Sequence, residues 1–280
     1  MRLPAFLVLA VLNAAPALAD PPRRVVSFNQ CGDQLVLALA DPQQIAGVSP
    51  YATDPTLSAV AEKARAFPQL DWQAESTIAL GPDLVLIGQN DRPVTKHILR
   101  AQGLRLYEIA LISDLDAARR QIVDVAALLG HPERGAKLLA DLDAARARLR
   151  AAPKPQFHTA LLINRGSYTA GERSLAATLL EEAGLKPPPG APPGYGGYVP
   201  LERLLMLRPD VIVLNNLPRE SDQGSYNLSH PALDALYPPQ RRIILPPRYT
   251  ICGGAALVEA FDYLAGVLAR LAQSPTMRTN

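Results

Sequence analysis

This chain has little net charge and few histidine, cysteine and aromatic residues. Each shortage excludes some classes of function. The 280 residues include 28 Lys and Arg against 26 Asp and Glu, a formal net charge of +2. A nucleic-acid partner requires a concentrated basic face, so we expect none. The basic pairs Arg119-Arg120 and Arg241-Arg242 are interpreted as solvated surface.

Histidine is too scattered to support a metal site or a catalytic triad. The chain has four, His97, His131, His158 and His230, and no two have the spacing of zinc ligands. A G-x-S-x-G elbow and a phosphate-binding glycine loop are also missing from the sequence. We therefore expect no catalytic residues, no cofactor and no metal site. A secreted hydrolase using a serine of "NRGSYTAGERS" is kept as the weaker alternative.

The one long hydrophobic run lies at the N-terminus, in "MRLPAFLVLAVLNAAPALAD". An arginine, an apolar run and the small residues Ala17 and Ala19 predict a secretory signal peptide over 1–19, cleaved after Ala19. A membrane anchor is the alternative, but the run is short and contains Asn13 and Pro16. Cleavage would leave 280 − 19 = 261 residues with a net charge of 27 − 26 = +1. No later run approaches the roughly 20 apolar residues of a membrane span, so we expect a soluble exported protein.

Short apolar runs alternate with helical patterns along the rest of the chain. β-branched runs bounded by turn residues predict strands that are covered on both faces. Helices between such strands are typical of an α/β protein. The expected strands cover 24–28, 44–48, 83–87, 104–109, 158–164, 210–214 and 242–245. The glycines and prolines of "PPPGAPPGYGGY" (187–198) predict an irregular lip without a regular element.

An internal near-repeat indicates two lobes of similar construction. "ESTIALGPDLVLIG" (75–88) and "ERLLMLRPDVIVLN" (202–215) each run from a glutamate through Pro-Asp into an apolar strand. The offset is constant, since 202 − 75, 209 − 82 and 210 − 83 all equal 127. "HPERGAKLLADLDAARARLR" predicts a long helix near the middle of the chain, where it could join the lobes stiffly. A second helix is expected from about Ala255 to Leu271.

In order and spacing, these stretches resemble the periplasmic substrate-binding proteins that serve ABC importers of vitamin B12, siderophores and heme. "RRVVSFNQCGDQLVLALA", "VPLERLLMLRPDVIVLN", "SHPAL" and "CGGAALVEAFDYLA" contribute to the likeness, which covers nearly all of the mature chain. The resemblance implies two Rossmann-like α/β lobes joined by a single long helix, with ligand in the cleft between them. The corresponding boundaries are a lobe over 20–130, the linking helix over 131–153 and a lobe over 154–280.

The resemblance also implies a partner. Glu75 and Glu202 hold matching places, one in each lobe, at the start of a helix. In the family, one exposed glutamate per lobe pairs with arginines on a two-fold-symmetric permease at the inner membrane. Favourable placement of a carboxylate at a helix N-terminus is the plainer explanation. We expect a monomer that docks through these two glutamates.

Ligand-binding residues are expected at the ends of the strands, where such sheets bind ligands. Aromatic rings suit a macrocycle or a catecholate, and arginine suits carboxylates or a negatively charged siderophore. The candidates are Asn29, Gln30, Tyr51, Trp72, Asn90 and Arg92 in the first lobe, and Arg165, Tyr168, Tyr195, Tyr198, Asn215, Arg248 and Tyr249 in the second. Cobalamin-like and siderophore ligands rank nearly level. Heme is the alternative within the family, with Tyr51, Tyr168 or Tyr249 as an iron ligand.

The two cysteines, Cys31 and Cys252, are 221 residues apart (252 − 31). In the implied fold, one follows the first strand of the first lobe and the other precedes the last helix of the second, so both loops face the cleft. Because the periplasm is oxidising, a disulfide that joins the lobes is favoured. Two free thiols, or a thiolate ligand to a metal, are the alternatives.

Overall fold

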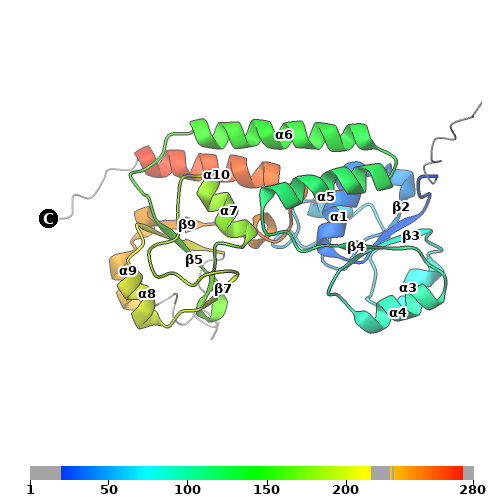
Figure 1. Cartoon of the computed structure of the whole chain (residues 1–280), viewed down its shortest axis with the longest axis horizontal. Coiled ribbons are helices and arrows are strands. Elements are labelled where there is room, and N and C mark those ends of the chain that lie inside the picture. The colour runs from blue at the N-terminus through cyan, green and yellow to red at the C-terminus, as the bar shows by residue number, and fades with distance from the viewer. Residues whose placement is uncertain (1–19, 216–227, 229, 274–280) are drawn as a thin grey trace, which may run out of the picture.

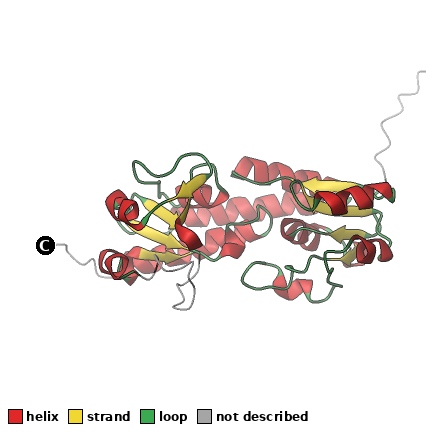
Figure 2. Ribbon diagram, turned by 90° about the horizontal axis from the view of Figure 1, so that it is seen from below, coloured by secondary structure: helices red, strands yellow, loops and turns green. Residues whose placement is uncertain are grey.

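The computed structural model describes residues 20–215, 228 and 230–273. The predicted signal peptide, residues 1–19, lies outside the described residues. The strands form two separate sheets, which Figure 1 and Figure 2 show at opposite ends of an elongated molecule. We call each sheet, with the helices that cover it, the N-terminal lobe and the C-terminal lobe. The predicted class, two α/β lobes, is confirmed.

The first sheet is entirely parallel and has the order β2-β1-β3-β4. Its alternate residues belong to different cores: Val25 and Leu84 face one hydrophobic cluster, while Val26 and Val85 face another. Both faces are therefore buried, as the continuous apolar runs predict. The strands are β1 (Val25–Ser27), β2 (Ile45–Gly47), β3 (Leu84–Gly88) and β4 (Leu106–Ile109).

The second sheet has the order β7-β6-β5-β8-β9, with β5, β8 and β9 parallel and β6 and β7 antiparallel. The prediction that 187–198 holds no regular element is wrong at its end, where Gly196–Tyr198 forms β7. Glycine permits this pairing, because a Cβ on Gly196 would lie 2.0 Å from the carbonyl oxygen of Thr169 on β6. The strands are β5 (Ala160–Ile163), β6 (Tyr168–Ala170), β7 (Gly196–Tyr198), β8 (Val211–Leu214) and β9 (Arg242–Ile244).

Helices cover both sheets. Those between β1 and β5 are α1 (Gln30–Leu39), α2 (Ala61–Ala64), α3 (Ala74–Ala79), α4 (Pro93–Ala101), α5 (Leu115–Leu128) and α6 (Pro132–Ala151). Those after β6 are α7 (Leu175–Glu182), α8 (Leu201–Leu207), α9 (Pro231–Leu236) and α10 (Ala256–Gln273). Short 3-10 turns occur at η1 (Pro42–Gln44), η2 (Arg165–Ser167), η4 (Pro239–Arg241) and η5 (Pro247–Tyr249). None of the described helices is both long and apolar enough to cross a membrane.

The internal repeat has a structural cause at its Pro-Asp step. Asp83, just before β3, accepts hydrogen bonds from the backbone N–H groups of Arg23 and Arg24 before β1. Asp210, just before β8, accepts hydrogen bonds from the backbone N–H groups that precede β5 in the same way. Each aspartate thus joins the starts of two neighbouring parallel strands. The helix-turn-strand context that the repeat predicts is confirmed in both lobes.

α6 lies along one side of the molecule and packs against helices of both lobes (Figure 1). It contacts α5 and α1 on the N-terminal side, and α10 and α7 on the C-terminal side. Asp143 of α6 pairs with Arg119 of α5, and Arg148 of α6 pairs through two bonds with Asp262 of α10. The helix therefore has contacts that fix it to each lobe. The domain boundaries at 130/131 and 153/154 stay a prediction.

Candidate functional site

Each sheet contains one topological switch point. β2 and β3 lie on opposite sides of β1, and β6 and β8 lie on opposite sides of β5. In open α/β sheets, ligands bind beyond the carboxyl ends of the strands at such points. The residues that directly follow β1 and β3, and those that follow β5 and β8, therefore define the candidate site.

A side-chain amide bridges the switch point in each lobe. Asn29 Nδ2, after β1, donates to Asp91 Oδ2, after β3, at 2.6 Å. Asn215 Nδ2, after β8, donates to Asn164 Oδ1, after β5. Asn29 also caps α1, because its Oδ1 accepts hydrogen bonds from the first backbone N–H groups of that helix. The predicted residues Asn29 and Asn215 thus bind other parts of the protein, and a ligand surface would lie outward of these two bridges.

Three aromatic rings and one arginine form a cluster beside the switch point of the N-terminal lobe. The ring of Trp72 lies 5.3 Å, centroid to centroid, from Phe28 and also 5.3 Å from Tyr51. The guanidinium carbon of Arg92 lies 4.1 Å from the centroid of the Trp72 ring. Because Tyr51 is 47% exposed, the cluster presents an aromatic surface to the outside. Tyr51, Trp72 and Arg92, predicted separately, are brought together.

Two members of this cluster have unusual backbone conformations. Trp72 has a φ of 70° and Arg92 a φ of 40°, in the left-handed region that non-glycine residues seldom occupy. Such conformations persist where the surroundings hold them, and they concentrate at functional sites. The two residues are in contact with each other, which makes this cluster a candidate for such a site.

The two remaining polar candidates of the N-terminal lobe differ in position. Gln30, in the first turn of α1, donates through Nε2 to the carbonyl oxygen of Leu57. Asn90 is exposed, two residues beyond the end of β3. Gln30 therefore binds a neighbouring loop, whereas Asn90 is exposed at the carboxyl end of the sheet.

Tyrosines form the corresponding surface of the C-terminal lobe. Tyr168 and Tyr198 pack edge to face with ring centroids 5.5 Å apart, across the β6–β7 pair. The Tyr168 hydroxyl donates to the carbonyl oxygen of Tyr195 at 2.9 Å. Tyr195 and Tyr198 are 54% and 79% exposed, and Arg173 lies over the Tyr195 ring at 5.0 Å. The lip thus carries two exposed rings, and the predicted Arg165 is exposed in η2 directly after β5.

The loops at the strand ends of the two lobes are in direct contact. Cys31 and Cys252 form a disulfide, with their Cα atoms 5.1 Å apart, so the predicted bond is confirmed. Arg248 Nη1 of the C-terminal lobe donates to the carbonyl oxygen of Pro55 in the N-terminal lobe at 3.0 Å. The carboxyl ends of both sheets are therefore held near one another, as a site shared by two lobes requires.

Tyr249 differs from the other predicted tyrosines because it is only 6% exposed. Its ring belongs to the hydrophobic core of the C-terminal lobe and packs 5.2 Å from the ring of Tyr263. Its hydroxyl accepts a hydrogen bond from Arg248 Nη2 at 3.2 Å. Tyr249 therefore supports Arg248 and offers little surface to a ligand.

A buried carboxylate binds the chain two residues before Tyr51. Asp33 of α1 has no exposed surface, and it accepts hydrogen bonds from the backbone N–H and the hydroxyl of Ser49 at 2.9 and 2.6 Å. Desolvation raises the pKa of Asp33 to about 6, although hydrogen bonds from Ser49 and Ser27 oppose the shift. Since its folded pKa is above the unfolded value, the group's contribution to stability decreases as the pH rises through about 6.

The two glutamates of the repeat are exposed at the second positions of α3 and α8. Figure 1 shows α3 and α8 on the side of the molecule that lies away from α6, one in each lobe. Glu75 and Glu202 thus open matching helices, as the sequence predicts.

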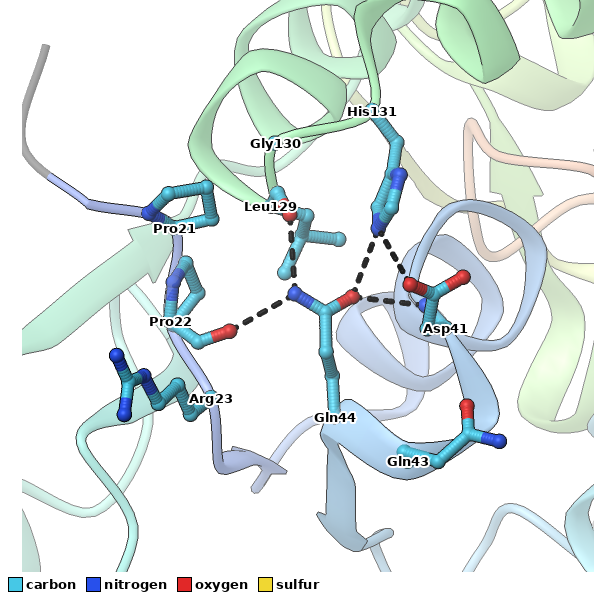
Figure 3. A pocket seen from close by; sticks show the side chains of 9 residues that line it. All are labelled: Pro21, Pro22, Arg23, Asp41, Gln43, Gln44, Leu129, Gly130 and His131. Carbon is cyan, nitrogen blue, oxygen red and sulfur yellow. Dashed lines mark hydrogen bonds and ion pairs between the residues drawn. The ribbon is translucent and has the colours of Figure 1, made fainter.

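A surface hollow of about 370 Å³ lies at the other end of the N-terminal lobe (Figure 3). The side-chain amide of Gln44 makes four hydrogen bonds there. Its Oε1 accepts from the backbone N–H of Asp41 and from Nε2 of His131. Its own Nε2 donates to the carbonyl oxygens of Pro22 and Leu129. These bonds join the start of the described chain to the α5–α6 turn, so we assign the hollow a structural role. Across the part of the chain described, no three His, Cys, Asp or Glu residues are grouped to hold a metal ion.

Sequence reasoning missed three residues of the site. Phe28 gives no signal because it directly follows a buried strand, and Arg173 gives none because it lies in the short turn between β6 and α7. Asp33 had a detectable signal, since it is a lone acid within the otherwise uncharged stretch "QCGDQLVLALA". A charged residue on the buried face of a helix is rare enough to indicate a specific role.

The profile of a known family matches most of the described chain. The periplasmic binding protein family matches residues 25–214. A cobalamin-binding protein from Halobacterium salinarum is 26% identical over 181 residues, which is 61% of this chain and 47% of that protein. The chain therefore spans about half the length of the curated relatives it matches.

Solved structures of similar fold cover almost the whole chain. The periplasmic heme-binding protein RhuT from Roseiflexus sp. RS-1 is 26% identical, covers 90% of this chain and 99% of its own, and has a TM-score of 0.69. The vitamin B12 binding protein BtuF of Vibrio cholerae is 16% identical, with 91% and 99% coverage and a TM-score of 0.67, a likeness of fold alone. With two lobes, facing strand ends and this sequence match, the chain belongs to the periplasmic binding protein family.

Proposed function

We propose that this protein is the periplasmic solute-binding component of an ABC importer, and that it captures a bulky metal chelate between its lobes without transforming it. The observation that carries this proposal is the pair of aromatic surfaces, one around Trp72 and one formed by Tyr168, Tyr195 and Tyr198, at the strand ends of a periplasmic binding protein. Large flat rings suit the face of a macrocycle or of an aromatic chelate. Export through the 1–19 signal peptide, a monomeric state and linkage of the lobes by α6 are part of the same proposal.

Three arginines of the site favour a ligand with negative charge. Arg92 stacks on Trp72 at 4.1 Å, Arg173 on Tyr195 at 5.0 Å and Arg248 on Tyr249 at 4.8 Å. Within the described residues, none of the three forms an ion pair with a carboxylate, unlike the arginines elsewhere in the chain that do.

The arginines of α6 differ, since Arg146 and Arg148 each bind a carboxylate through two hydrogen bonds. Guanidinium groups that are stacked on a ring and bound to no carboxylate are suited to carboxylates or other oxyanions. Heme and ferric siderophores with acidic groups supply such charges, whereas a corrinoid presents mostly amides. Heme is therefore the first ligand to test, followed by an anionic siderophore and by cobalamin.

Tyr51 is the tyrosine best placed to ligate iron if the ligand is heme. Of the three candidates, Tyr249 is buried and Tyr168 donates its hydroxyl to a backbone carbonyl. Tyr51 is about half exposed, beside Trp72, in the N-terminal lobe. Its phenol would face the ligand from the same side as Arg92.

The ligand class can be tested by titrating hemin, a ferric siderophore and cobalamin while recording the fluorescence of Trp72, the one tryptophan of the chain. We expect quenching by an anionic chelate. Arg92→Gln is expected to weaken that affinity by roughly 10- to 100-fold, the effect of losing one charged hydrogen bond. Arg105→Gln is the matched control, because Arg105 is exposed just before β4, at the opposite end of the strands.

Two results would contradict this proposal in different ways. If none of the three ligands quenches Trp72 or raises the melting temperature, the ligand class is wrong. If cobalamin binds while hemin and the siderophore do not, and Arg92→Gln binds it normally, the argument from charge is wrong and the binding role stands.

We also propose that Glu75 and Glu202 dock the loaded protein onto a two-fold-symmetric permease. Both are exposed on helices that face the same side of the molecule (Figure 1). Matched charges set the register and the rate of such an association. Glu75→Gln/Glu202→Gln is expected to abolish uptake in cells carrying the cognate importer, with ligand affinity in solution unchanged. Glu62→Gln/Glu133→Gln, which removes two other exposed acids, is the control; equal uptake by both double variants would refute the docking role.

A further inference from the structure

The first turn of α1 binds two different parts of the molecule with two adjacent pairs of side chains. Gln30 and Asp33 bind a loop of the N-terminal lobe. Cys31 and Gln34, one position further along, bind the C-terminal lobe. Residues three apart lie on the same side of a helix, so each pair acts as a unit.

The loop that α1 holds is the one that carries Tyr51. Asp33 binds the backbone N–H and hydroxyl of Ser49, at the start of the loop over 49–58. Gln30 binds the carbonyl oxygen of Leu57, near its end. Tyr51 lies between these two attachments, and its ring packs 5.3 Å from that of Trp72. The position of Tyr51 therefore depends on the first turn of α1.

The same turn is fixed to the other lobe. Cys31 is bonded to Cys252, which is completely buried. Gln34, also completely buried, accepts through Oε1 a hydrogen bond from the backbone N–H of Ala256, the first residue of α10, at 3.3 Å. A covalent bond and a buried hydrogen bond thus hold α1 against the start of α10.

We propose that the first turn of α1 couples the junction between the lobes to the Tyr51 loop, so that a change at Cys31–Cys252 or Gln34–Ala256 moves Tyr51 relative to Trp72. Gln30 and Asp33 are positioning residues in this scheme. The coupling itself is a property of the ligand-free protein. Only its consequence, a change in the ligand surface, rests on the proposed function.

Trp72 reports the coupling directly, because it is the one tryptophan and contacts Tyr51. Reducing the disulfide of the folded, ligand-free protein is expected to shift the Trp72 emission and to increase its quenching by acrylamide. Gln34→Met, which keeps the length of the side chain but removes the acceptor, is expected to shift the signal in the same direction with the disulfide intact.

The matched control is Thr178→Val. Thr178 Oγ1 of α7 donates to the carbonyl oxygen of Ser113, just before α5, and this contact bypasses α1. The coupling predicts no change in Trp72 emission for this variant. The proposal is overturned if reduction and Gln34→Met leave Trp72 unchanged, or if Thr178→Val shifts it equally, since the effect would then be general loosening.

A second test uses the charge on Asp33. An ionised Asp33 accepts both Ser49 hydrogen bonds, and protonation removes one of those acceptors, so the Trp72 signal of the wild type should titrate over roughly pH 5–7, around the raised pKa of this group. In Asp33→Asn, which is neutral throughout, the titration should disappear. An identical pH profile in the two proteins would refute the role of Asp33.

Comparing Asp33→Asn with the wild type separates the titration of Asp33 from that of the other charged groups nearby. Lys63 donates to the carbonyl oxygen of Leu37 on α1, and Arg248 donates to Pro55 in the loop. Within the loop, the Thr56 hydroxyl holds the pKa of Asp54 below its usual value. On α10, burial raises the pKa of Glu259, which Arg248 opposes. All four groups are retained in Asp33→Asn, so a pH response that survives in the variant belongs to them.

These experiments use no ligand, so their outcome is independent of the ligand class. A protein that binds none of the three chelates could still show the Trp72 response. Conversely, a protein that binds hemin but shows no response to reduction, Gln34→Met or pH would retain its proposed function and lose the coupling.

Discussion

The double substitution Cys31→Ala/Cys252→Ala is expected to lower the free energy of unfolding by about 2–5 kcal/mol. The bond joins residues 221 apart in sequence, so its loss releases an unusually long loop in the unfolded chain. In the chain-entropy description, stabilisation by a disulfide grows with the logarithm of loop length. Cys252 is also completely buried, so its truncation adds a small packing loss. Urea denaturation of oxidised wild type and double variant measures the difference.

Reduced wild type is the control for this experiment. Its stability should approach that of the double variant, because both lack the bond and differ only by two sulfur atoms. Intact mass after alkylation gives a direct check, since the unreduced protein should take up no alkylating reagent. Two alkylated thiols in the unreduced sample would show that the sulfurs are not bonded and would remove the basis of the prediction.

Asp210→Ala is expected to lower the free energy of unfolding by about 2–3 kcal/mol, because three hydrogen-bond donors lose the acceptor that they share. The carboxylate accepts from the backbone N–H groups of His158 and Thr159 and from the Thr159 hydroxyl, all near 2.8 Å. These bonds hold the start of β5 beside the start of β8. Asp83→Ala, the equivalent change in the N-terminal lobe, should lower the free energy of unfolding by less. Asp83 is exposed, so water can accept the hydrogen bonds that its carboxylate accepts. Equal losses would contradict this account of the repeat.

The effect of Asp210→Ala should also depend on pH. Burial alone would raise the pKa of Asp210, but the hydrogen bonds from His158 and Thr159 outweigh it and lower the pKa. A carboxylate with a lowered folded pKa stabilises the fold fully above its unfolded pKa, and this contribution is lost as the pH falls through the folded value. The difference between wild type and variant should therefore be full at pH 7 and should shrink below about pH 4. A constant difference down to pH 2 would show that the carboxylate charge has no part in it.

The parallel strands and the long helices could be predicted because their signals are local. β1, β3, β5 and β8 lie in largely apolar runs, and each falls within one or two residues of its predicted range. β6 and β7 could not, because Tyr168–Ala170 and Gly196–Tyr198 have no hydrophobic period. They form because glycine lets the two backbones approach each other closely in space, although about 25 residues separate the two strands in the sequence. Pairing of this kind is not encoded in either segment alone.

The site could be predicted as a set of residue types but not as an arrangement. Chain order places Tyr51, Trp72 and Arg92 in three separate loops, and only the fold shows that they stack on one another. Conversely, Tyr249 follows a strand just as a ligand-binding residue would, yet its ring fills the core. The sequence says which side chains follow strands, whereas the direction each one points depends on φ and ψ within a turn of two or three residues. The periodicity of the hydrophobic residues does not contain that information.

The hydrophobic core of the C-terminal lobe includes Ile112, Leu115 and Ala118, which precede α6 in the chain. A fragment beginning at Pro132 would thus lack part of its own interior and would expose the apolar surface that these three residues cover. We expect such a fragment to aggregate when produced alone and to be rescued by co-expression with the complementary half. The two halves are therefore not interchangeable modules, and exchanging one lobe between relatives would require the stretch before α6 to be exchanged with it.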